Sequence, residues 1–350
     1  MCSRGSRETR HLIVIGNSQN MREVESRSVD LVVTSPPYPM IEMWDELFGK
    51  LDPDVAEALA REDGTKAFDL MHVQLEKSWG EVVRTLRDGG IACINIGDAT
   101  RTIGNRFQMY SNHSRVTDWF ERAGVTSLPS IVWRKPTNAP NKFMGSGMLP
   151  PGAYVTLEHE HILVFRKGSR RSFDTPEERR LRSESSYFWE ERNRWFSDIW
   201  SDLLGTDQSL NGNSGRQRSG AFPFEVPYRL INMFSVKGDL VLDPFLGTGT
   251  TTLAAAASQR DSLGYEIDKT LAAVVRDRLK GFRETANSYI AARISRHREF
   301  AEGRKCGSVN EHHGFPCVSN QETAIRLELL DAVDIEDGGG VTVRYGGLAR

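Results

Sequence analysis

The segment Thr34-Ser35-Pro36-Pro37-Tyr38 places the strongest constraint on the fold, because two consecutive prolines follow a short apolar run. That run, Val29 to Val33, is rich in β-branched residues and is typical of a buried strand. Each proline fixes its φ angle and lacks an N–H group, so the strand must stop there and continue as a rigid loop. The loop then offers carbonyl oxygens, the Ser35 hydroxyl and the Tyr38 ring to its surroundings.

These groups suit the binding of a planar ring that carries an amine. The ring could stack on Tyr38 while Ser35 and a neighbouring carbonyl accept the amine hydrogens. A proline turn whose tyrosine packs in the core is the alternative interpretation of the pentapeptide alone. The rest of the chain has to distinguish the two.

Composition limits the class of protein without identifying it. The chain has 350 residues, enough for one large α/β domain with insertions or for two domains. Lys+Arg is 45 and Asp+Glu is 47, so net charge does not indicate a nucleic-acid partner, although a local basic patch would suffice. The four cysteines form no disulfide framework, and we find neither a bilayer-spanning window nor a secretory signal. We therefore expect a cytoplasmic protein with no membrane partner.

Strands and helices are predicted to alternate, which is typical of a parallel sheet. Apolar runs predict strands at 11–16, 29–33, 91–96, 127–133, 160–165, 240–242 and 262–265, and amphipathic segments predict helices at 68–86, 116–123, 228–234, 253–257 and 270–282. Residues 50–66 are expected to form a surface excursion, and 134–154 a long loop. The tail beyond Arg293 is expected to be less regular, with 322–330 and 341–345 as a helix or as edge strands.

A second feature, Asp243 to Glu266, has the organisation of a nucleoside site. The strand at 240–242 runs into Gly247-Thr248-Gly249 and a helix, so the backbone can approach a ligand at the helix N-terminus. Glu266 ends the next strand about 20 residues later, where an acidic residue binds ribose hydroxyls. Thr252 replaces the third glycine of the dinucleotide fingerprint, which favours a cofactor with a ribose but no phosphates. An ordinary strand–turn–helix corner is the alternative.

Both features resemble motifs of the amino-group DNA methyltransferases. The segment from Asp243 to Thr251 (Asp-Pro-Phe-Leu-Gly-Thr-Gly-Thr-Thr) is similar to their S-adenosylmethionine motif. Thr34 to Tyr38 resembles their catalytic motif, in the Ser-Pro-Pro-Tyr form associated with N4-cytosine specificity. The catalytic motif precedes the cofactor motif, which is the order of the β subgroup. The resemblance covers residues 11–282 and implies a prokaryotic enzyme of a restriction–modification system that acts on double-stranded DNA.

The resemblance also implies an architecture. The fold class would be α/β, a doubly wound, mostly parallel, Rossmann-like sheet of the S-adenosylmethionine-dependent methyltransferases with a permuted motif order. Residues 11–165 would form the catalytic half of the domain, 221–292 its S-adenosylmethionine-binding half, and 293–350 a C-terminal extension. Residues 166–220, where basic and aromatic side chains are interleaved, would form an inserted target recognition region. A cognate restriction endonuclease would be a functional partner.

Individual roles follow from the same resemblance. The residues expected to contact the cofactor are Asn17, Thr34, Phe222, Asp243, Pro244, Phe245, Gly247, Gly249, Thr250, Thr251 and Glu266. Asn17 stands where the family usually has an acid, and His159 to Lys167 resembles the strand beside the base pocket. The catalytic residues would be Ser35, Pro36, Pro37 and Tyr38.

The chemistry of such a site explains its residues. The exocyclic amine of cytosine is a weak nucleophile because its lone pair is delocalised into the ring. If Ser35 and the Pro36 carbonyl accept its two hydrogens, the lone pair is directed at the sulfonium methyl for in-line transfer. No covalent intermediate and no metal are required. The target base would be flipped out of the duplex and stacked on Tyr38.

Further candidates for contact with the base or with DNA are Trp44, Asp45, Asp98, Arg170 and Arg171. Trp44 and Asp45 closely follow the catalytic loop, and Asp98 lies at the carboxyl end of a strand. Arg170 and Arg171 belong to a basic run that could track phosphates. Structural roles remain open for each: core packing for Trp44, a turn cap for Asp98, and a solvated face for the arginines.

An N6-adenine methyltransferase with the same machinery is the nearest alternative; there the motif usually begins with Asp or Asn, whereas Ser35 is smaller and neutral. A 5-methylcytosine enzyme would need a cysteine nucleophile, and too little chain follows Cys317 for its remaining motifs. A non-catalytic DNA-binding protein with a degenerate cofactor site is a third possibility. The spacing of Cys306, His312, His313 and Cys317 fits no standard zinc pattern, so we expect no metal.

Overall fold

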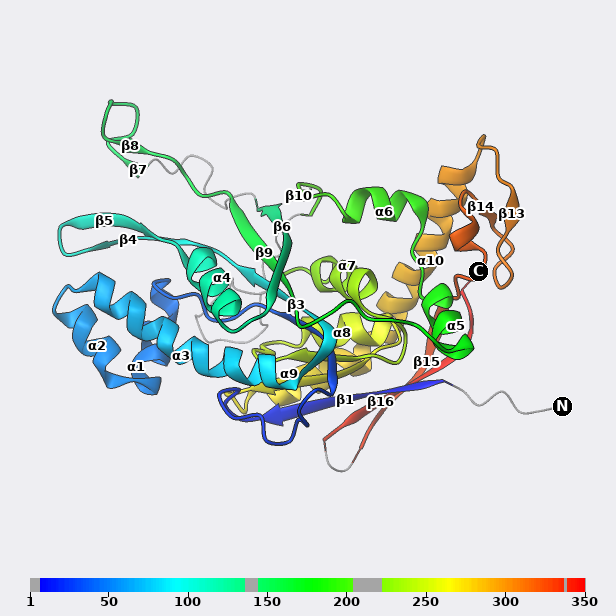
Figure 1. Ribbon diagram of the computed structural model, residues 1–350, viewed down its shortest axis with the longest axis horizontal. Coiled ribbons are helices and arrows are strands. Elements are labelled where there is room, and N and C mark those ends of the chain that lie inside the picture. The colour runs from blue at the N-terminus through cyan, green and yellow to red at the C-terminus, as the bar shows by residue number, and fades with distance from the viewer. Residues whose placement is uncertain (1–6, 136–143, 204–221, 337–338, 350) are drawn as a thin grey trace.

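The large central sheet organises the molecule (Figure 1). The computed structural model describes residues 7–135, 144–203, 222–336 and 339–349. Within them, ten strands form one sheet in the spatial order β10-β6-β9-β3-β2-β11-β12-β1-β16-β15. The predicted recognition region, 166–220, is described only as far as residue 203, and part of the predicted loop at 134–154 also lies outside the described residues.

The elements have the following bounds. The strands of the large sheet are β1 (Glu8–Ile15), β2 (Val29–Thr34), β3 (Leu86–Ile96), β6 (Thr126–Arg134), β9 (His159–Arg166), β10 (Ile199–Trp200), β11 (Leu240–Asp243), β12 (Asp261–Glu266), β15 (Glu328–Ile335) and β16 (Val341–Leu348). Two-stranded hairpins are formed by β4 (Ala99–Ile103) with β5 (Arg106–Tyr110), β7 (Met144–Gly145) with β8 (Ala153–Tyr154), and β13 (Ser308–Val309) with β14 (Pro316–Cys317). The α-helices are α1 (Asp45–Leu51), α2 (Pro53–Ala60), α3 (Gly64–Thr85), α4 (Asn112–Arg122), α5 (Pro176–Glu184), α6 (Trp189–Trp195), α7 (Glu225–Phe234), α8 (Thr250–Ala257), α9 (Leu271–Gly281) and α10 (Arg283–Ala301).

Strand direction brings the important loops to one edge of the sheet. In the large sheet β9 and β16 run against the remaining strands, which share one direction. The register pairs Val32 of β2 with Leu242 of β11, and Asp243 with Gly264 of β12. The carboxyl ends of these three strands are therefore level, and we call this side the carboxyl edge. The predicted doubly wound, mostly parallel arrangement is confirmed.

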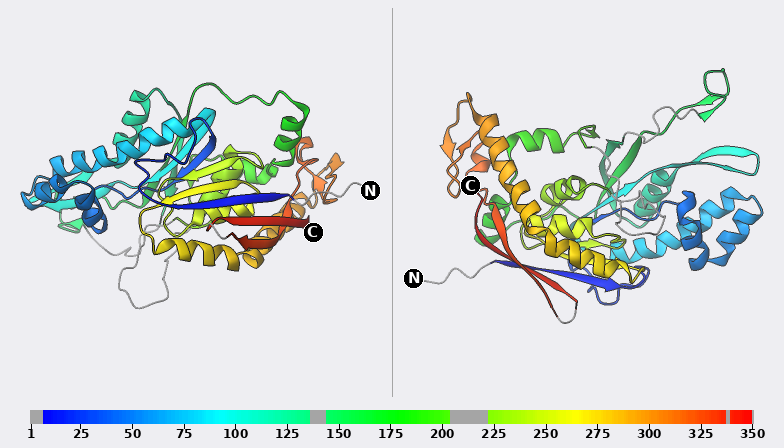
Figure 2. Two further views of the ribbon diagram at one scale, coloured as in Figure 1. Left: turned by 90° about the horizontal axis from the view of Figure 1, so that it is seen from below. Right: turned by 180° about the vertical axis from the view of Figure 1, so that it is seen from behind.

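Helices cover both faces of the sheet, and this explains why its central strands are apolar throughout. Val33 and Val241 point to the face covered by α7, α8, α9 and α10, whereas Val32 and Leu242 point to the face covered by α3 and α4. Figure 2 shows α3 and the α9–α10 pair on opposite sides of the sheet. All six residues of β2 are buried, so β2 has no polar face.

The predicted strands and helices are all present, and the structure adds elements that the sequence did not predict, among them the β4–β5 hairpin, α5 and α6. Helices α1 and α2 occupy much of the segment expected to be a surface excursion. Helix α10 extends to Ala301, although the sequence beyond Arg293 lacks a clear apolar stripe. Its buried face carries Arg293 and His297, which pair with the carboxylates of Glu191 and Glu190, so ion pairs replace apolar contacts there. Finally, the open choice in the tail is decided in favour of strands added at one edge of the sheet, where β16 pairs with β1 and β15 pairs with β16. Strand β15 begins only at Glu328, so most of the segment predicted at 322–330 lies before it.

Chain segments that are distant in sequence share this sheet. Strand β2, from the first predicted half, pairs with β11, from the second.

Along the described chain, no helix combines the length and apolar character needed to cross a membrane.

Candidate active site

Two segments meet directly at the carboxyl edge. We call them the proline loop (Ser35 to Tyr38) and the glycine turn (Gly247 to Gly249). Thr34, the last residue of β2, donates a hydrogen bond from its hydroxyl to Asp243 Oδ1 at 2.6 Å. The Thr251 hydroxyl, in the first turn of α8, donates to the Val33 carbonyl at 3.3 Å. All four residues are buried. The two predicted motifs therefore form a single site.

The Tyr38 hydroxyl is the centre of a polar network beside this junction. It donates to Glu160 Oε2 at 3.0 Å, and it accepts from Asn95 Nδ2 at 2.8 Å. Ser35 Oγ lies 2.9 Å from the same hydroxyl. Asn95 Nδ2 also donates to Glu160 Oε2 at 2.7 Å, and Lys135 Nζ donates to Glu160 Oε1 at 2.8 Å. Burial, followed by the charge of Glu160, raises the pKa of Tyr38 well above its usual range, so this hydroxyl keeps its proton at neutral pH.

Neighbouring strands hold the Tyr38 ring in place. Asn95 comes from the end of β3, and Glu160 from the start of β9, which runs antiparallel to β3. At Gly97 an added Cβ would lie 3.1 Å from Tyr38 Cε2, so a larger residue would displace the ring. Tyr38 is partly buried against the core, but its hydroxyl belongs to the polar network. This arrangement favours the site interpretation of the pentapeptide over a simple proline turn.

The glycine turn has the geometry expected of a cofactor cradle. Gly249 has φ +80°, and an added Cβ would lie 2.6 Å from Val275 of α9, so both its conformation and its surroundings require glycine. Glu266 Oε2 accepts from the Gly247 amide, and Oε1 accepts from the Asp268 amide, both at 2.8 Å. The carboxylate predicted to bind ribose hydroxyls therefore stands against the turn.

Asp243 is a buried carboxylate whose hydrogen-bond donors among the described residues are neutral. Its Oδ1 accepts from the Thr34 hydroxyl and, at 3.1 Å, from the Phe245 amide. Burial raises the pKa of Asp243 to about 6. A positively charged ligand at this position would stabilise the ionised carboxylate. This donor set fits a sulfonium or ammonium cofactor.

The other residues predicted to contact the cofactor lie around the same edge or in the adjoining core. Pro244 and Thr250 are buried, and Phe222 packs in the core beside α7. The Phe245 ring lies edge-on to Trp79, with 5.6 Å between centroids. Asn17 lies two residues after β1, and the preceding residue, Gly16, donates from its amide to the Glu266 carbonyl at 2.9 Å. The side-chain oxygen of Asn17 accepts from the Gln19 amide. Their contacts with a cofactor stay predictions.

Trp44 and Asp45 have structural partners. Trp44 is partly buried against the core on the α3 face of the sheet. Both carboxylate oxygens of Asp45 accept from Arg101 of β4, at 2.8 and 2.6 Å, which ties α1 to the β4–β5 hairpin. The described hydrogen bonds do not connect either residue to the Tyr38 network.

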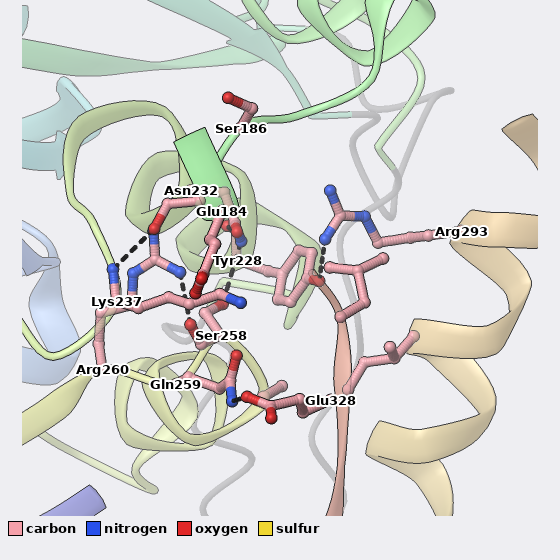
Figure 3. A pocket seen from close by; sticks show the side chains of 14 residues that line it. Glu184, Ser186, Tyr228, Asn232, Lys237, Ser258, Gln259, Arg260, Arg293 and Glu328 are labelled. Carbon is pink, nitrogen blue, oxygen red and sulfur yellow. Dashed lines mark hydrogen bonds between the residues drawn. The ribbon is translucent and has the colours of Figure 1, made fainter. Parts of the chain in front are cut away.

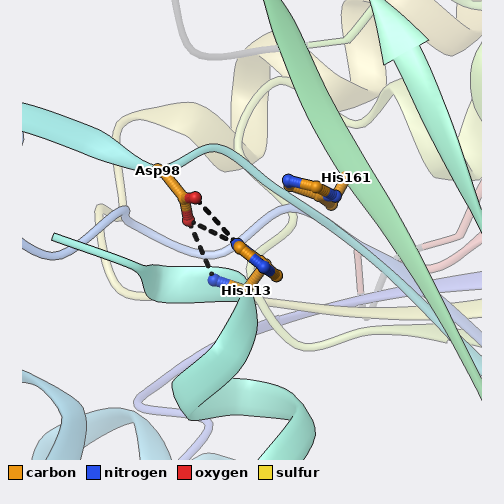
Figure 4. Close-up of side chains that lie close together, drawn as sticks. All are labelled: Asp98, His113 and His161. Atoms are coloured by element: carbon orange, nitrogen blue, oxygen red, sulfur yellow. Dashed lines mark hydrogen bonds and ion pairs between the residues drawn. The ribbon is translucent and has the colours of Figure 1, made fainter. Parts of the chain in front are cut away.

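Asp98 lies just beyond β3 and contacts helix α4 (Figure 4). Its carboxylate accepts from the His113 amide at 3.1 Å and lies 2.7 Å from His113 Nδ1. His161 of β9 stacks on His113 with 4.0 Å between ring centroids, and burial lowers the pKa of His161 to about 4. Because Glu160 and His161 are consecutive in a strand, they point to opposite faces of the sheet. The geometry favours the structural role, a cap for the first turn of α4.

Arg171 lies at the opposite edge from the loop. Its guanidinium donates to Asp239, which immediately precedes β11, at 2.7 Å, and lies 3.6 Å from Asp30 near the start of β2. Arg170 is exposed in the same segment. The structure does not bring these arginines to the proline loop, and Arg171 forms ion pairs inside the protein. Their predicted phosphate contacts stay predictions.

A small polar cavity lies at the same edge as Arg171, where the central parallel strands begin (Figure 3). We call this side the amino edge. It is lined by residues of α7, α10 and β15 together with Lys237, which precedes β11, and Arg260, which precedes β12. Its volume of about 10 Å³ suits roughly one water molecule. It is too small and too distant from the glycine turn to be the cofactor site.

The cysteine and histidine residues of the C-terminal segment are outside the site. Cys317 is buried in β14, whose hairpin packs against α10. The His313 ring nitrogens lie 2.8 Å from the Ala349 carbonyl and 2.9 Å from the Leu327 amide, so both have protein partners. Among the described residues, Cys306, His312, His313 and Cys317 do not gather as metal ligands.

Sequence reasoning missed Asn95 and Lys135, and it included Glu160 only as part of the strand that resembles the one beside the base pocket. A signal was present for Asn95, which is the polar residue in the apolar run from Ile91 to Ile96. Glu160 likewise begins a predicted strand as a carboxylate between two histidines. Their partnership with Tyr38 depends on strand order and register, which no local pattern contains.

Comparison with known proteins agrees with this geometry. The chain is 52% identical over 321 residues to the Type II methyltransferase M.MthZI of Methanothermobacter thermautotrophicus, covering 91% of this chain and 90% of that protein. It is 50% identical to the Type II methyltransferase M.MjaI of Methanocaldococcus jannaschii, covering 77% and 91% respectively. The structure of a putative DNA modification methylase from Thermus thermophilus, solved with S-adenosyl-L-methionine, matches with a TM-score of 0.59 and 30% identity, covering 77% of this chain and 92% of that one.

The family model described as DNA methylase, which represents the N6- and N4-type enzymes, matches residues 29–277. That span runs from the first residue of β2 into α9 and so contains the proline loop, the Tyr38 network and the glycine turn. The fold is accordingly the Rossmann-like fold of the S-adenosylmethionine-dependent methyltransferases. The chain belongs to the N6/N4 DNA methylase family.

Proposed function

We propose that this protein transfers a methyl group to the exocyclic N4 amine of a cytosine in a specific double-stranded DNA sequence. The observation that carries the proposal is the hydrogen bond from Thr34 to Asp243, which holds the Ser-Pro-Pro-Tyr loop against the glycine turn. An amine bound at the loop would therefore lie beside a cofactor bound at the turn.

The cofactor is S-adenosyl-L-methionine, which supplies an electrophilic methyl group on its sulfonium when bound. Glu266 would accept hydrogen bonds from the ribose hydroxyls, and Asp243 would face positive charge of the methionine part. The glycine turn, with Gly249 in its left-handed conformation, would let the backbone approach the cofactor closely.

The loop would bind and orient the amine. Ser35 Oγ and the Pro36 carbonyl would accept its two hydrogens, and this would direct the nitrogen lone pair toward the methyl group. The base would be flipped out of the duplex, because its amine is enclosed in the base pair, and it would stack on Tyr38. The hydrogen bonds of the Tyr38 hydroxyl would hold that ring in the stacking position.

We favour cytosine over adenine because Ser35, a small neutral hydroxyl, begins the motif where N6-adenine enzymes usually have Asp or Asn. The alternative function is N6-adenine methylation by the same machinery. Expression in a host free of DNA methylation, followed by mass spectrometry of digested DNA, tests the choice. N4-methylcytosine is expected, and N6-methyladenine would contradict the proposal.

We further propose that the methylation protects DNA from a cognate restriction endonuclease. The names of M.MthZI and M.MjaI as Type II methyltransferases support this role.

We also propose that residues 166–220 recognise the target sequence. Strand β10 pairs with the carboxyl end of β6, so the chain after Trp200 leaves on the same edge as the catalytic loop. Mapping the methylated positions in expressed DNA would define that sequence.

A further inference from the structure

We propose that Glu160 is a positioning residue that sets the direction of the hydrogen bond between Ser35 and Tyr38. The inference rests on the proposed function, in which Ser35 accepts hydrogens from the target amine. In this arrangement Ser35 donates its own proton to Tyr38 and presents only acceptor lone pairs to the substrate.

The direction follows from counting protons at the Tyr38 hydroxyl. A phenol has one proton to donate and can accept from two partners. Ionised Glu160, paired with Lys135, can only accept, so the Tyr38 proton points to Glu160 at 3.0 Å. Asn95 Nδ2 can only donate, and it occupies one acceptor position at 2.8 Å.

The remaining acceptor position on Tyr38 faces Ser35. Ser35 Oγ lies 2.9 Å away, and with the Tyr38 proton already committed, Ser35 must be the donor. The orientation of the Asn95 amide agrees with this assignment, because its nitrogen also donates to Glu160 Oε2 at 2.7 Å. If the amide were flipped, its oxygen would face the carboxylate oxygen, and the two would repel. Every group in the series of hydrogen bonds that runs from Lys135 through Glu160 and Tyr38 to Ser35 therefore has a fixed donor or acceptor role.

This direction matters for an amine substrate. A serine hydroxyl that donates to Tyr38 keeps two lone pairs with which it can accept amine hydrogens. If the bond were reversed, Tyr38 would occupy one lone pair and the Ser35 proton would be free to face the amine, donor against donor. A glutamine at position 160 permits that reversal, because its amide nitrogen can donate to Tyr38.

The test is Glu160→Gln, which keeps the size of the side chain and removes its obligatory acceptor character. We expect kcat to fall by about 10- to 100-fold. The KM for S-adenosylmethionine should change less than about twofold, because Asp243 and Glu266 are untouched. A purely structural role for Glu160 would not separate kcat from KM in this way.

Glu158→Gln is the matched control, since Glu158 lies two residues away and pairs with Arg134 at 3.4 Å outside the network. It should retain wild-type kcat and the wild-type KM for S-adenosylmethionine. Wild-type kcat in Glu160→Gln would overturn the inference.

A second variant, Tyr38→Phe, keeps the ring and removes the hydroxyl through which Glu160 acts. The loss caused by Glu160→Gln should disappear when Tyr38→Phe is already present, whereas two independent losses would overturn the inference. Should Glu160→Gln fail to fold, Tyr38→Phe alone decides: a reduced kcat at unchanged cofactor KM supports the inference, and unchanged kcat rejects it. Failure of the proposed function is distinguishable, because the wild-type enzyme would then yield no N4-methylcytosine.

Discussion

The Thr34 hydroxyl and Asp243 Oδ1 are 2.6 Å apart although 209 positions separate the two residues in the chain. The bond crosses from β2 to β11 and joins the start of the proline loop to the start of the glycine turn. It requires β2 and β11 to be adjacent, parallel and in register. The same register places the proline loop and the glycine turn, for which we propose amine and cofactor binding, at one edge of the sheet.

Replacing Thr34 by valine removes the donor and preserves the shape of the side chain. A buried carboxylate then loses one of its hydrogen bonds, so the free energy of unfolding should fall by about 1–3 kcal/mol. Affinity for S-adenosylmethionine should also fall, since Asp243 becomes harder to ionise. Thermal denaturation and calorimetric titration measure the two effects. Thr117→Val is the control, because the Thr117 hydroxyl donates to the His113 carbonyl within α4; equal effects in both variants would contradict the coupling.

Asp243 should make stability and cofactor binding depend on pH. Its pKa is raised from 3.8 to about 6 in the folded protein, so the native state binds more protons than the unfolded chain between these values. The stability linked to Asp243 is therefore present below pH 4 and is lost as pH rises through about 6. Cofactor binding needs the ionised form and should weaken below that pH.

Asp243→Asn separates these two effects. The amide oxygen can still accept from Thr34 and Phe245, so the variant should be more stable than the wild type at pH 8, by on the order of 2 kcal/mol, and similar to it near pH 4. It should also bind S-adenosylmethionine poorly at every pH. Denaturant unfolding and titrations across this range test both statements. Tight, pH-independent binding by the variant would rule out the assigned role.

Ser35→Ala removes the proposed acceptor for the amine. We expect kcat for methyl transfer to fall by roughly 100- to 1,000-fold, because a preorganised hydrogen bond at the reacting group is lost. Cofactor affinity should be retained. Transfer of radiolabelled methyl groups to DNA measures the rate, and Ser295→Ala on the outer face of α10 is the control. A variant with nearly full activity would remove Ser35 from the mechanism.

Gly249→Ala should damage the cofactor turn. Alanine would be held at φ +80° with its Cβ 2.6 Å from Val275, so we expect a loss of about 2 kcal/mol in stability together with weaker cofactor binding. Gly281→Ala provides the comparison, since Gly281 ends α9 and has open space around its Cβ position. Melting temperatures with and without S-adenosylmethionine reveal both effects. Equal behaviour of the two variants would contradict the cradle.

Arg171→Glu should affect stability and leave DNA binding intact. The charge reversal places a third carboxylate beside Asp30 and Asp239. The free energy of unfolding should therefore fall by about 2–4 kcal/mol. The affinity for DNA and its dependence on salt should match those of the wild type in folded protein. Arg170→Glu, in the same segment but exposed, should leave stability unchanged. A large drop in DNA affinity for Arg171→Glu without a loss of stability would restore the phosphate-contact hypothesis.

Much of the fold and part of the site could be predicted from local sequence. Buried strands such as β2 and β11 are short β-branched or aliphatic runs, and prolines or glycines mark their ends. The proline loop, the glycine turn and Glu266 are recognisable because their chemistry depends on residues close together in the chain. Helix α10 was harder to predict beyond Arg293, because buried Arg293 and His297 interrupt its apolar face. The groups that pair with these two side chains, Glu191 and Glu190 among them, lie elsewhere in the chain.

The sequence by itself determined that a rigid proline loop follows one strand and a glycine turn follows another, and from these it predicted an amine site and a nucleoside site. Only the tertiary structure decided which side chains meet there. Asn95 and Glu160 reach Tyr38 across 57 and 122 positions because β3 and β9 pair in one antiparallel register. A shift of one residue in that register would turn Glu160 to the opposite face of the sheet. Hydrogen-bond partners across strands depend on such alignment, and the spacing of residues along the chain does not specify it.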